Sequence, residues 1–474
     1  MPLILPGNVA TATASTAYDI ANSCRFNKAD TPGLSRSTGD GNERIGSFSF
    51  WWKTADPHDG SIFYQVRIDS SNFFNIGMDG GGNIEVTNKD GGSYNLQCET
   101  TAIYRDHSAW YHVCAIVDTT QAVAANRMKL YINGIQVTSF QTETYPDQND
   151  DLKMNSNSTT AYISHSGNCV HGYLAEFVAI DGTAQAVTDF GEFDEDSPTI
   201  WKPKDVSELT KGVNGFYLDF EDSSALGNCA FGGTDFTVSN LAAADQAVDT
   251  PTNNFATLNP LSGTHDNRAT YSEGNCKMVT VASGYQQTQS TIGVSAGKWY
   301  AECIFLSQDG GAASPGIHAG FSGSQITGAW LGYESGYGYG SMGTTVYHDS
   351  SSSSWGSTAA SSANDILGIA LDLDNKKIYW SVNGTWQNSS DPAANSNGFT
   401  IDDDAINTEL GFYLFEIADL SSVRNYTYAV NFGGCPGWTL SSAVADGNGY
   451  GTFEYAPPSG FLAMCTKNLG SDGG

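Results

Sequence analysis

Large apolar residues alternate with smaller or polar residues along most of the chain. The alternation has a period of two and is clearest over residues 110–117, 129–132, 299–305 and 366–373. It predicts β-strands, because successive side chains of a strand point to opposite faces of a sheet. Short segments of Gly, Asn and Asp separate these strands, and helical periodicity is almost absent. The pattern therefore predicts an all-β chain built from antiparallel β-sandwiches.

The strand at 299–305 also predicts which side chains enter the core. Trp299 shares one face with Ala301 and Cys303, whereas Tyr300 shares the other face with Glu302. A ring as large as Trp299 on an apolar strand face is expected to be largely buried.

Length and charge limit the possible functions. A chain of 474 residues exceeds one ordinary hydrophobic core, so two or three domains are expected. It carries 51 acidic and 21 basic residues, a net charge of −30. This charge repels nucleic-acid backbones and anionic membranes, and we therefore expect neither nucleic-acid binding nor membrane insertion.

The sequence begins without a basic segment followed by an apolar run, so no signal peptide is expected. No segment approaches the roughly 20 apolar residues of a membrane span, and we expect synthesis in a cytoplasm. The nine cysteines are spread singly and form no CxxC motif, so mostly free structural thiols are expected.

Three motifs in the second half resemble the SPRY family. They are Gly297-Lys-Trp-Tyr-Ala-Glu, Ile366-Leu-Gly-Ile-Ala-Leu-Asp-Leu-Asp, and a strand from Ile378 that ends in Val-Asn-Gly-Thr-Trp. The resemblance implies a β-sandwich that binds partners through loops at one end and has no catalytic activity. In the first half, Trp110-Tyr-His-Val, followed by Lys129-Leu-Tyr-Ile-Asn-Gly, resembles the laminin-G-like and pentraxin branch of the concanavalin-A-like jelly rolls. That resemblance implies a second sandwich, which commonly binds glycans or glycoproteins, often with calcium.

Segments that begin at Asp219 and Phe453 resemble the linker and tail of tailed-bacteriophage proteins that join these two domains. The resemblance implies a virion protein. We expect a laminin-G-like domain with an N-terminal arm at 1–205, a connector at 206–274, a SPRY domain at 275–440 and a C-terminal tail at 441–474.

Aromatic rings in loops are the candidate ligand-binding residues. Tyr337 and Tyr339 lie in a Gly-rich stretch, Trp386 follows the Asn-Gly turn, and Trp355 follows a run of serines. Such rings can stack on sugar faces or form interface contacts. The alternative is that they cover the edge of the sandwich.

A possible calcium site is the candidate metal centre. Asp79, Asn83 and Asp118 lie in oxygen-rich turns, which is the chemistry that calcium prefers. Ordinary turn hydrogen bonding explains the same residues. The eight histidines lack the spacing of a zinc site, and no other cofactor is expected.

Glu192 and Asp194 are the best catalytic candidates, because concanavalin-A-like glucanases carry a strand motif E-x-D-x-x-E. Ser197 stands where the third carboxylate would be. A solvated acidic loop or helix start is the preferred interpretation, and no catalytic residues are expected.

The sequence thus predicts a non-enzymatic virion surface protein, such as a fibre, spike or decoration subunit. Its expected partners are other virion proteins and a host surface glycan or protein, and many identical copies would bind together through avidity. A purely architectural cement protein and a glycan depolymerase on the jelly roll are the alternatives.

Overall fold

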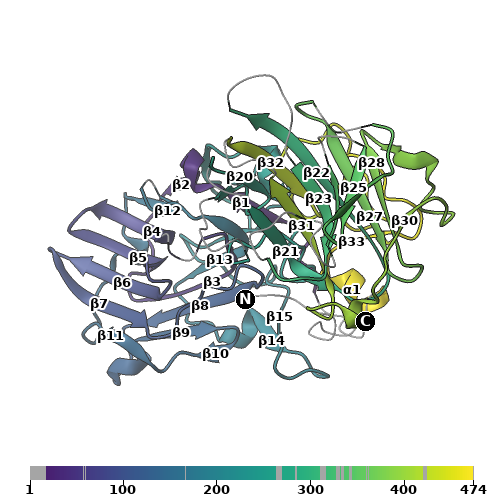
Figure 1. Cartoon of the computed structure of the whole chain (residues 1–474). Coiled ribbons are helices and arrows are strands. Elements are labelled where there is room, and N and C mark those ends of the chain that lie inside the picture. The colour runs from purple at the N-terminus through teal and green to yellow at the C-terminus, as the bar shows by residue number, and fades with distance from the viewer. Residues whose placement is uncertain are drawn as a thin grey trace. The chain divides into compact units, whose positions relative to one another are not determined.

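The computed structural model describes residues 18–472 apart from 57, 59, 166, 263–268, 283–285, 310–316, 327–330, 332–335, 341–343, 359, 361 and 420–423. The expected N-terminal arm therefore lies outside the described residues. The chain forms two compact units, which divide between Thr252 and Asn253 (Figure 1). Both units are built from antiparallel sheets, so the predicted all-β fold class is confirmed.

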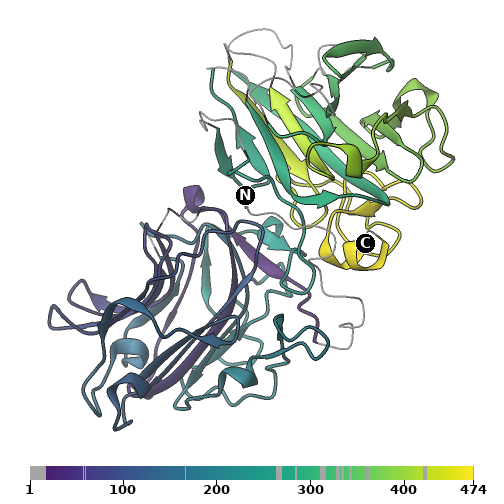
Figure 2. The same cartoon turned by 60° about the horizontal axis from the view of Figure 1, so that its bottom comes forward.

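The first unit contains two large sheets and a short ladder (Figure 2). The strands of the first sheet, in spatial order, are β10 (Ile135–Gln136), β9 (Met128–Ile132), β8 (Tyr111–Asp118), β3 (Ile45–Thr54), β13 (Gly172–Asp181), β1 (Ser23–Phe26) and β18 (Gln246–Ala247), with β16 (Phe216–Leu218) also paired to β13. The strands of the second sheet are β11 (Phe140–Thr144), β7 (Ser93–Thr100), β6 (Ile84–Asp90), β5 (Asn72–Met78), β4 (Ser61–Asp69), β12 (Thr160–Ile163), β2 (Gly33–Ser37) and β17 (Thr237–Ser239). The short ladder joins β14 (Gly191–Phe193) to β15 (Trp201–Pro203). The main core lies between the two large sheets.

The chain divides differently from the expected plan, because residues 206–252 are part of the first unit and not a separate connector. They supply β16 to β13, β17 to β2 and β18 to β1. Residues 253–274 belong to the second unit. The polar composition of the segment concealed these short strands, each of which has only two or three residues.

The outer face of the first sheet is buried like its inner face. Cys114 of β8 and Val178 of β13 lie on this outer face, and Phe190, Val206 and Tyr217 pack against them. All ten residues of β13 are buried as a result. Polar side chains on this face must therefore be paired within the protein.

His112 illustrates this pairing. Its Nδ1 accepts a hydrogen bond from Trp201 Nε1 at 3.1 Å. Nε2 therefore carries the proton and donates to Ser49 Oγ at 2.8 Å. Burial lowers the pKa of His112 to about 3, so the ring is a neutral structural residue.

A buried ion pair joins the end of the first unit to its central strand β3. Lys53 Nζ lies 2.8 Å from Asp249 Oδ2, and both side chains are 1% exposed. Trp110 Nε1 donates to the other carboxylate oxygen at 3.2 Å. The residues before Thr252 are thus fixed by a charge pair with no access to water.

The second unit also contains two sheets. The strands of its larger sheet, in order, are β19 (Thr270–Ser272), β20 (Lys277–Val279), β32 (Tyr426–Asn431), β22 (Lys298–Gln308), β27 (Ile366–Asp372), β28 (Lys377–Val382) and β29 (Thr385–Trp386), with β30 (Phe399–Thr400) on β28 and β33 (Leu462–Ala463) parallel to β22. The smaller sheet contains β21 (Gln287–Val294), β31 (Tyr413–Asp419), β23 (Ile317–Ser322), β24 (Gly336–Gly340), β25 (Thr345–His348) and β26 (Ser351–Ser354). The described helices are α1 (Thr466–Asp472) and the single-turn 3-10 helices η2 (Lys28–Asp30), η3 (Ala124–Asn126), η4 (Lys153–Asn155), η5 (Val187–Asp189), η6 (Ala243–Asp245), η7 (Gln387–Ser389) and η8 (Ala405–Asn407).

The two faces of β22 follow the predicted pattern. Trp299 is fully buried between the sheets of the second unit together with Ala301 and Cys303. Glu302, on the opposite face, accepts hydrogen bonds from the backbone N–H groups of Glu454 and Tyr455 at 2.9 and 2.8 Å. The C-terminal segment is therefore held on the outer face of this sheet.

All nine cysteines are buried thiols that form no disulfide bond, which confirms the expectation of structural thiols. No helix among the described residues is long and apolar enough to cross a membrane.

We predict that Asp249→Asn lowers the free energy of unfolding by about 3–5 kcal/mol, because it removes the counter-charge that lies 2.8 Å from the buried Lys53 ammonium. Urea denaturation measures this loss. Asp151→Asn is the matched control, because Asp151 pairs with Arg44 at 2.6 Å on the exposed surface, where such a pair contributes about 0–1 kcal/mol. Equal losses in the two variants would contradict the importance of the buried pair.

Candidate functional site

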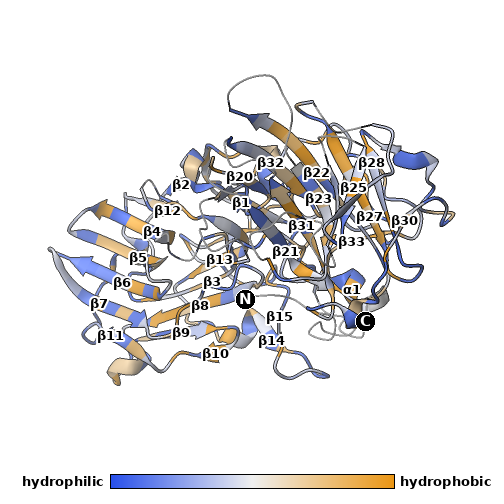
Figure 3. Cartoon of the chain, in the orientation of Figure 1, coloured by the Kyte–Doolittle hydropathy of each residue, from blue (hydrophilic) through white to orange (hydrophobic). Residues whose placement is uncertain are grey.

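The outward face of the second sheet of the first unit is polar, in contrast to the covered face of the first sheet. Val66 of β4, Phe74 of β5 and Val86 of β6 point into the core. The residues between them point outward, because side chains alternate along a strand. Figure 3 shows hydrophilic and hydrophobic positions alternating along these strands.

The outward residues form a middle row that crosses six strands. Strand pairing places each member directly opposite the next on the neighbouring strand. In order, the row is Ser35 (β2), Tyr162 (β12), Gln65 (β4), Asn75 (β5), Thr87 (β6) and Gln97 (β7). It thus presents hydroxyl and amide groups at the spacing of adjacent strands, about 4.8 Å.

Two amide oxygens in the middle row have no hydrogen-bond partner among the residues that the structure describes. Gln65 is 4% exposed and Asn75 is 5% exposed, yet Gln65 Oε1 and Asn75 Oδ1 are unpaired. Buried polar atoms are normally satisfied, and an unpaired acceptor destabilises a fold by about 1–3 kcal/mol. A ligand that donates hydrogen bonds would remove this cost.

One flank of the middle row carries rings and cations. Phe73 of β5 packs edge-on to Tyr94 of β7, with ring centroids 6.2 Å apart. Lys89 Nζ lies 5.2 Å from the centre of the Tyr94 ring, and Tyr94 is 45% exposed. Within the middle row, Tyr162 packs edge-on to His165 at 4.2 Å. These rings supply apolar surface beside hydrogen-bonding groups.

The other flank carries two carboxyl groups. Glu85 of β6 lies directly opposite Glu99 of β7. Asn75 Nδ2 donates to Glu85 Oε1 at 3.0 Å. Burial and the nearby charges of Glu99 and Asp79 raise the pKa of Glu85 to about 7. We call the middle row and its two flanks the polar face.

The expectation that Tyr337 and Tyr339 are exposed loop rings is wrong. Both are fully buried in β24 and point into the core of the second unit. Tyr339 stacks on Trp380 with ring centroids 5.7 Å apart. The glycines that suggested a loop instead allow close strand packing, since a Cβ at Gly338 would lie 2.9 Å from Leu331.

The other two predicted rings are partly accessible. Trp355 is half-buried and packs edge-on to Tyr339 and Trp380, so it covers the edge of the sandwich. Trp386 is half-buried at the end of β29. Neither ring lies in the pocket of the second unit described below.

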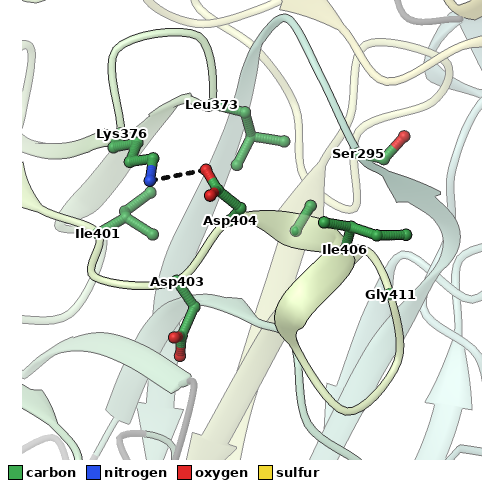
Figure 4. Close-up of a pocket in the computed structure, with 9 residues that line it drawn as sticks. Ser295, Leu373, Lys376, Ile401, Asp403, Asp404, Ile406 and Gly411 are labelled. Carbon is green, nitrogen blue, oxygen red and sulfur yellow. Dashed lines mark ion pairs between the residues drawn. The ribbon is translucent and has the colours of Figure 1, made fainter.

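The second unit has a pocket of about 380 Å³ that no predicted residue lines (Figure 4). Leu373, Ile401 and Ile406 supply its apolar surface, and Lys376 pairs with Asp404 at 2.7 Å on its rim. Ile406 is 80% exposed. The residues come from separate turns, so their proximity has no signature in the sequence.

The residues predicted for a calcium site stabilise turns. Asp79 Oδ1 accepts hydrogen bonds from the N–H groups of Gly81 and Asn83 at 2.9 and 2.8 Å. Asp118 Oδ1 accepts from the Thr120 N–H at 3.1 Å. Among the described residues, no group of three or more His, Cys, Asp or Glu side chains could hold a metal ion. The structure thus places these residues in the turn roles that were the alternative to a calcium site.

The catalytic candidates lie in a short strand and its turn, and not in a plain loop or helix start. Glu192 is exposed in β14, whereas Asp194 is 4% exposed and accepts from the N–H groups of Asp196 and Ser197. Lys202 Nζ lies 3.5 Å from both carboxylates. Backbone hydrogen bonds and the nearby Lys202 ammonium hold the pKa of Asp194 below its usual range.

Comparison with known proteins is consistent with this architecture. Residues 30–182 match a laminin-G family described as the concanavalin A-like lectin/glucanases superfamily. This match and the two antiparallel sheets confirm the concanavalin-A-like fold predicted for the first unit. No curated protein matches the chain at a significant level.

Three similar solved structures share 14–16% identity with the chain. The SPRY domain of human HERC1 has 14% identity and a TM-score of 0.29, and the match covers 38% of this chain and 99% of that chain. The native heptameric SAP-like pentraxin from Limulus polyphemus has 15% identity, a TM-score of 0.27, and coverage of 36% and 82%. Domain 4 of AbnA, an extracellular GH43 arabinanase from Geobacillus stearothermophilus in complex with arabinotriose, has 16% identity, a TM-score of 0.26, and coverage of 32% and 68%. The virion assignment stays a prediction.

Buried glutamates should make stability fall as the pH rises from about 4.5 to 7–8. Burial raises the pKa of Glu176 to about 8 and those of Glu302 and Glu416 to about 7. A carboxyl group whose pKa is raised by folding stabilises the folded state fully below the unfolded pKa of 4.5. This contribution decreases as the pH rises and is lost once the pH has passed the folded-state pKa of about 7–8. His112 and His318, with pKa values lowered to about 3 by burial, stabilise above pH 6.5 and lose this contribution in acid.

The glutamates should therefore lower the melting temperature as the pH rises from about 4.5 to 8, most clearly above pH 6.5, where the opposing contribution of the histidines is complete. Glu416→Gln should reduce that fall, because this buried side chain would no longer ionise. A Glu416→Gln protein with the same pH slope as the wild type would contradict this explanation.

Proposed function

We propose that the first unit binds carbohydrate through the polar face. The observation that carries the proposal is the pair of buried, unpaired amide oxygens of Gln65 and Asn75. Sugar hydroxyl groups are hydrogen-bond donors in abundance, and they would satisfy both acceptors. The rings of Tyr162, Tyr94 and Phe73 would pack against the apolar faces of sugar rings.

The match of residues 30–182 to a lectin and glucanase superfamily supports this chemical class. The net charge of −30 supports it as well, because it disfavours nucleic acids and anionic membranes as ligands. Few charges point from the middle row itself, so hydrogen bonds and ring contacts would supply most of the affinity.

The biological setting is a further part of the proposal. The resemblance of the linker and the tail to tailed-phage proteins supports a virion surface protein that adheres to a host glycan. Many copies on a particle would make individually weak sugar contacts effective through avidity. A purely architectural role is the alternative, and it predicts that the purified protein binds no host glycan.

We predict that Tyr162→Ala and Gln65→Ala each weaken glycan binding about tenfold or more, as expected for the loss of a central ring or buried hydrogen bond. Titration calorimetry with host surface polysaccharide and neutral oligosaccharides measures the affinity. Gln136→Ala is the matched control, because Gln136 is an exposed glutamine of the first sheet. A wild-type protein that binds none of these glycans would contradict the proposed function.

We also propose that the chain is not a glycoside hydrolase. Lys202 Nζ lies 3.5 Å from both acids of the glucanase-like motif, Glu192 and Asp194, and Ser197 stands in place of the third carboxylate. Incubation with host polysaccharide should release no reducing ends. Release that disappears in Glu192→Gln would show that this motif is catalytic, and release that disappears in Glu85→Gln would assign catalysis to the polar face.

A further inference from the structure

The flank of the polar face that carries rings also carries two basic side chains. Arg67 of β4 lies directly opposite Phe73 of β5. Phe73 lies opposite Lys89 of β6, which in turn lies opposite Tyr94 of β7. We call these four residues the basic row, since they cross the sheet beside the middle row. Arg67, Phe73 and Lys89 are half-buried, and Tyr94 is 45% exposed.

Neither base of this row forms an ion pair with a carboxylate among the described residues. The nearest acids in the sequence are engaged elsewhere. Asp69, two residues after Arg67, accepts hydrogen bonds from the turn that follows it at 2.7 and 3.0 Å. Asp90, directly after Lys89, pairs with Lys153 at 3.3 Å. In a chain with 51 acids for 21 bases, the basic row therefore keeps two cations that are available to a ligand.

The charge of Arg67 acts on the middle row as well. Burial and the nearby positive charge of Arg67 lower the pKa of His165. The His165 ring packs edge-on to Tyr162 of the middle row, with ring centroids 4.2 Å apart. The Arg67 guanidinium thus acts next to the ring that the proposed function places against a sugar.

The rings of the basic row supply apolar surface beside the charges. Phe73 and Tyr94 meet edge to face, with ring centroids 6.2 Å apart and an angle of 81° between the ring planes. Lys89 Nζ lies 5.2 Å from the centre of the Tyr94 ring. Arg67 and Lys89 are two strands apart, so their backbones are separated by about 10 Å. One sugar ring can therefore contact an aromatic ring and a base together.

The unpaired acceptors of the middle row lie one step along the same strands. Gln65 is two residues from Arg67 and Asn75 is two residues from Phe73, about 7 Å away at the rise of a strand. Both amide oxygens are buried and lack a partner among the described residues. The middle row thus offers acceptors and the basic row offers charged donors. A sugar that has both hydroxyl groups and a carboxylate matches the two rows at once.

The opposite flank gives the polar face an electrical direction. Glu85 lies four residues from Lys89 along β6, about 13 Å away, and Glu99 lies opposite it. These acids disfavour a carboxylate at that end of the face. Charges are screened over about 8 Å at physiological ionic strength, so the local bases, and not the net charge of −30, determine what binds at the basic row.

We propose that the basic row binds the carboxylate of an acidic sugar while the middle row binds hydroxyl groups of the same glycan. This inference names the class of sugar and rests on the proposed glycan-binding function. The Arg67 guanidinium can donate two parallel hydrogen bonds to a carboxylate, and the Lys89 ammonium supplies a second positive charge. Phe73 and Tyr94 would pack against the apolar face of the sugar ring.

The test compares each ligand in two charge states. Malto-, cello- and galacto-oligosaccharides, and the same compounds oxidised to uronates at their primary hydroxyl groups, are titrated against the whole chain by calorimetry. The wild type should bind the best uronate about tenfold more tightly than its neutral parent, the effect of one charge-assisted hydrogen bond. Raising the salt concentration from about 0.05 M to about 0.5 M should reduce this preference and leave the affinity for the neutral form unchanged.

Arg67→Gln and Lys89→Gln should each lower the preference to about threefold or less, because each removes one of the two charges. The affinity for the neutral form should change little in both variants. Arg67→Lys keeps the charge without the planar pair of donors and should retain part of the preference. Lys129→Gln is the matched control for net charge, because Lys129 is a half-buried lysine of β9 in the first sheet. It should keep the wild-type preference.

The outcomes separate this inference from the proposed function. A wild type that binds neither the neutral oligosaccharides nor their uronates overturns both. A wild type that binds the neutral forms at least as tightly as the uronates overturns the role of the basic row alone. The same holds if Arg67→Gln and Lys89→Gln both keep the preference, or if Lys129→Gln loses it equally. Thermal melting checks that each variant is folded, and if one unfolds, the other variant and the salt dependence decide.

Discussion

The structure depends on the burial of both faces of its central strands. In the first unit, Phe190, Val206 and Tyr217 pack on the outer face of the first sheet, and all ten residues of β13 are buried. Every polar group on that face then needs a partner within the chain, since an unpaired buried group is costly. The Lys53–Asp249 ion pair and the Trp201–His112–Ser49 chain meet this requirement. They also fix where the segment that covers the sheet must lie.

The second unit meets the same constraint with its C-terminal segment. Glu302 points away from the core of the second unit and is fully buried. The Glu302 carboxylate accepts hydrogen bonds from the backbone N–H groups of Glu454 and Tyr455. Asn431 Nδ2 and the Tyr300 hydroxyl also donate to it. The Glu of the Gly-Lys-Trp-Tyr-Ala-Glu motif therefore has a structural role, which is to hold the tail on the sheet.

The sequence predicted what depends on neighbouring residues along one strand. Alternation placed Trp299 in the core and located β8, β9, β22 and β27 to within a few residues. It failed where several strands contribute one residue each. The polar face is an example, because Gln65, Asn75, Thr87 and Gln97 become a row only through the register of four strands. Polar alternation in each strand was the available signal, and it indicated only an outward face.

Tyr337 and Tyr339 show the opposite error, in which local composition concealed a regular pattern. Tyr-Gly-Tyr is itself an alternation of large and small residues, which predicts a strand with one ringed face. The glycine content suggested a loop, but Gly320 and Gly338 oppose each other across β23 and β24, where a Cβ at Gly320 would meet the backbone oxygen of Tyr337. Glycine here serves close packing between strands and not a turn.

The difference between covered and bare sheet faces gives the polar face its significance. An outward sheet face could consist of threonine and valine. Both have a high intrinsic preference for β-strands, and neither side chain carries an amide oxygen that needs a partner. The first unit instead holds Gln65 and Asn75 at nine-tenths burial with an unpaired oxygen each, and it opposes Glu85 to Glu99 without a cation. Each of these features lowers stability. The same amide oxygens and carboxyl groups can form hydrogen bonds that the described residues do not supply. A ligand rich in hydroxyl groups would convert this cost into binding energy, and it would also stabilise the first unit against unfolding.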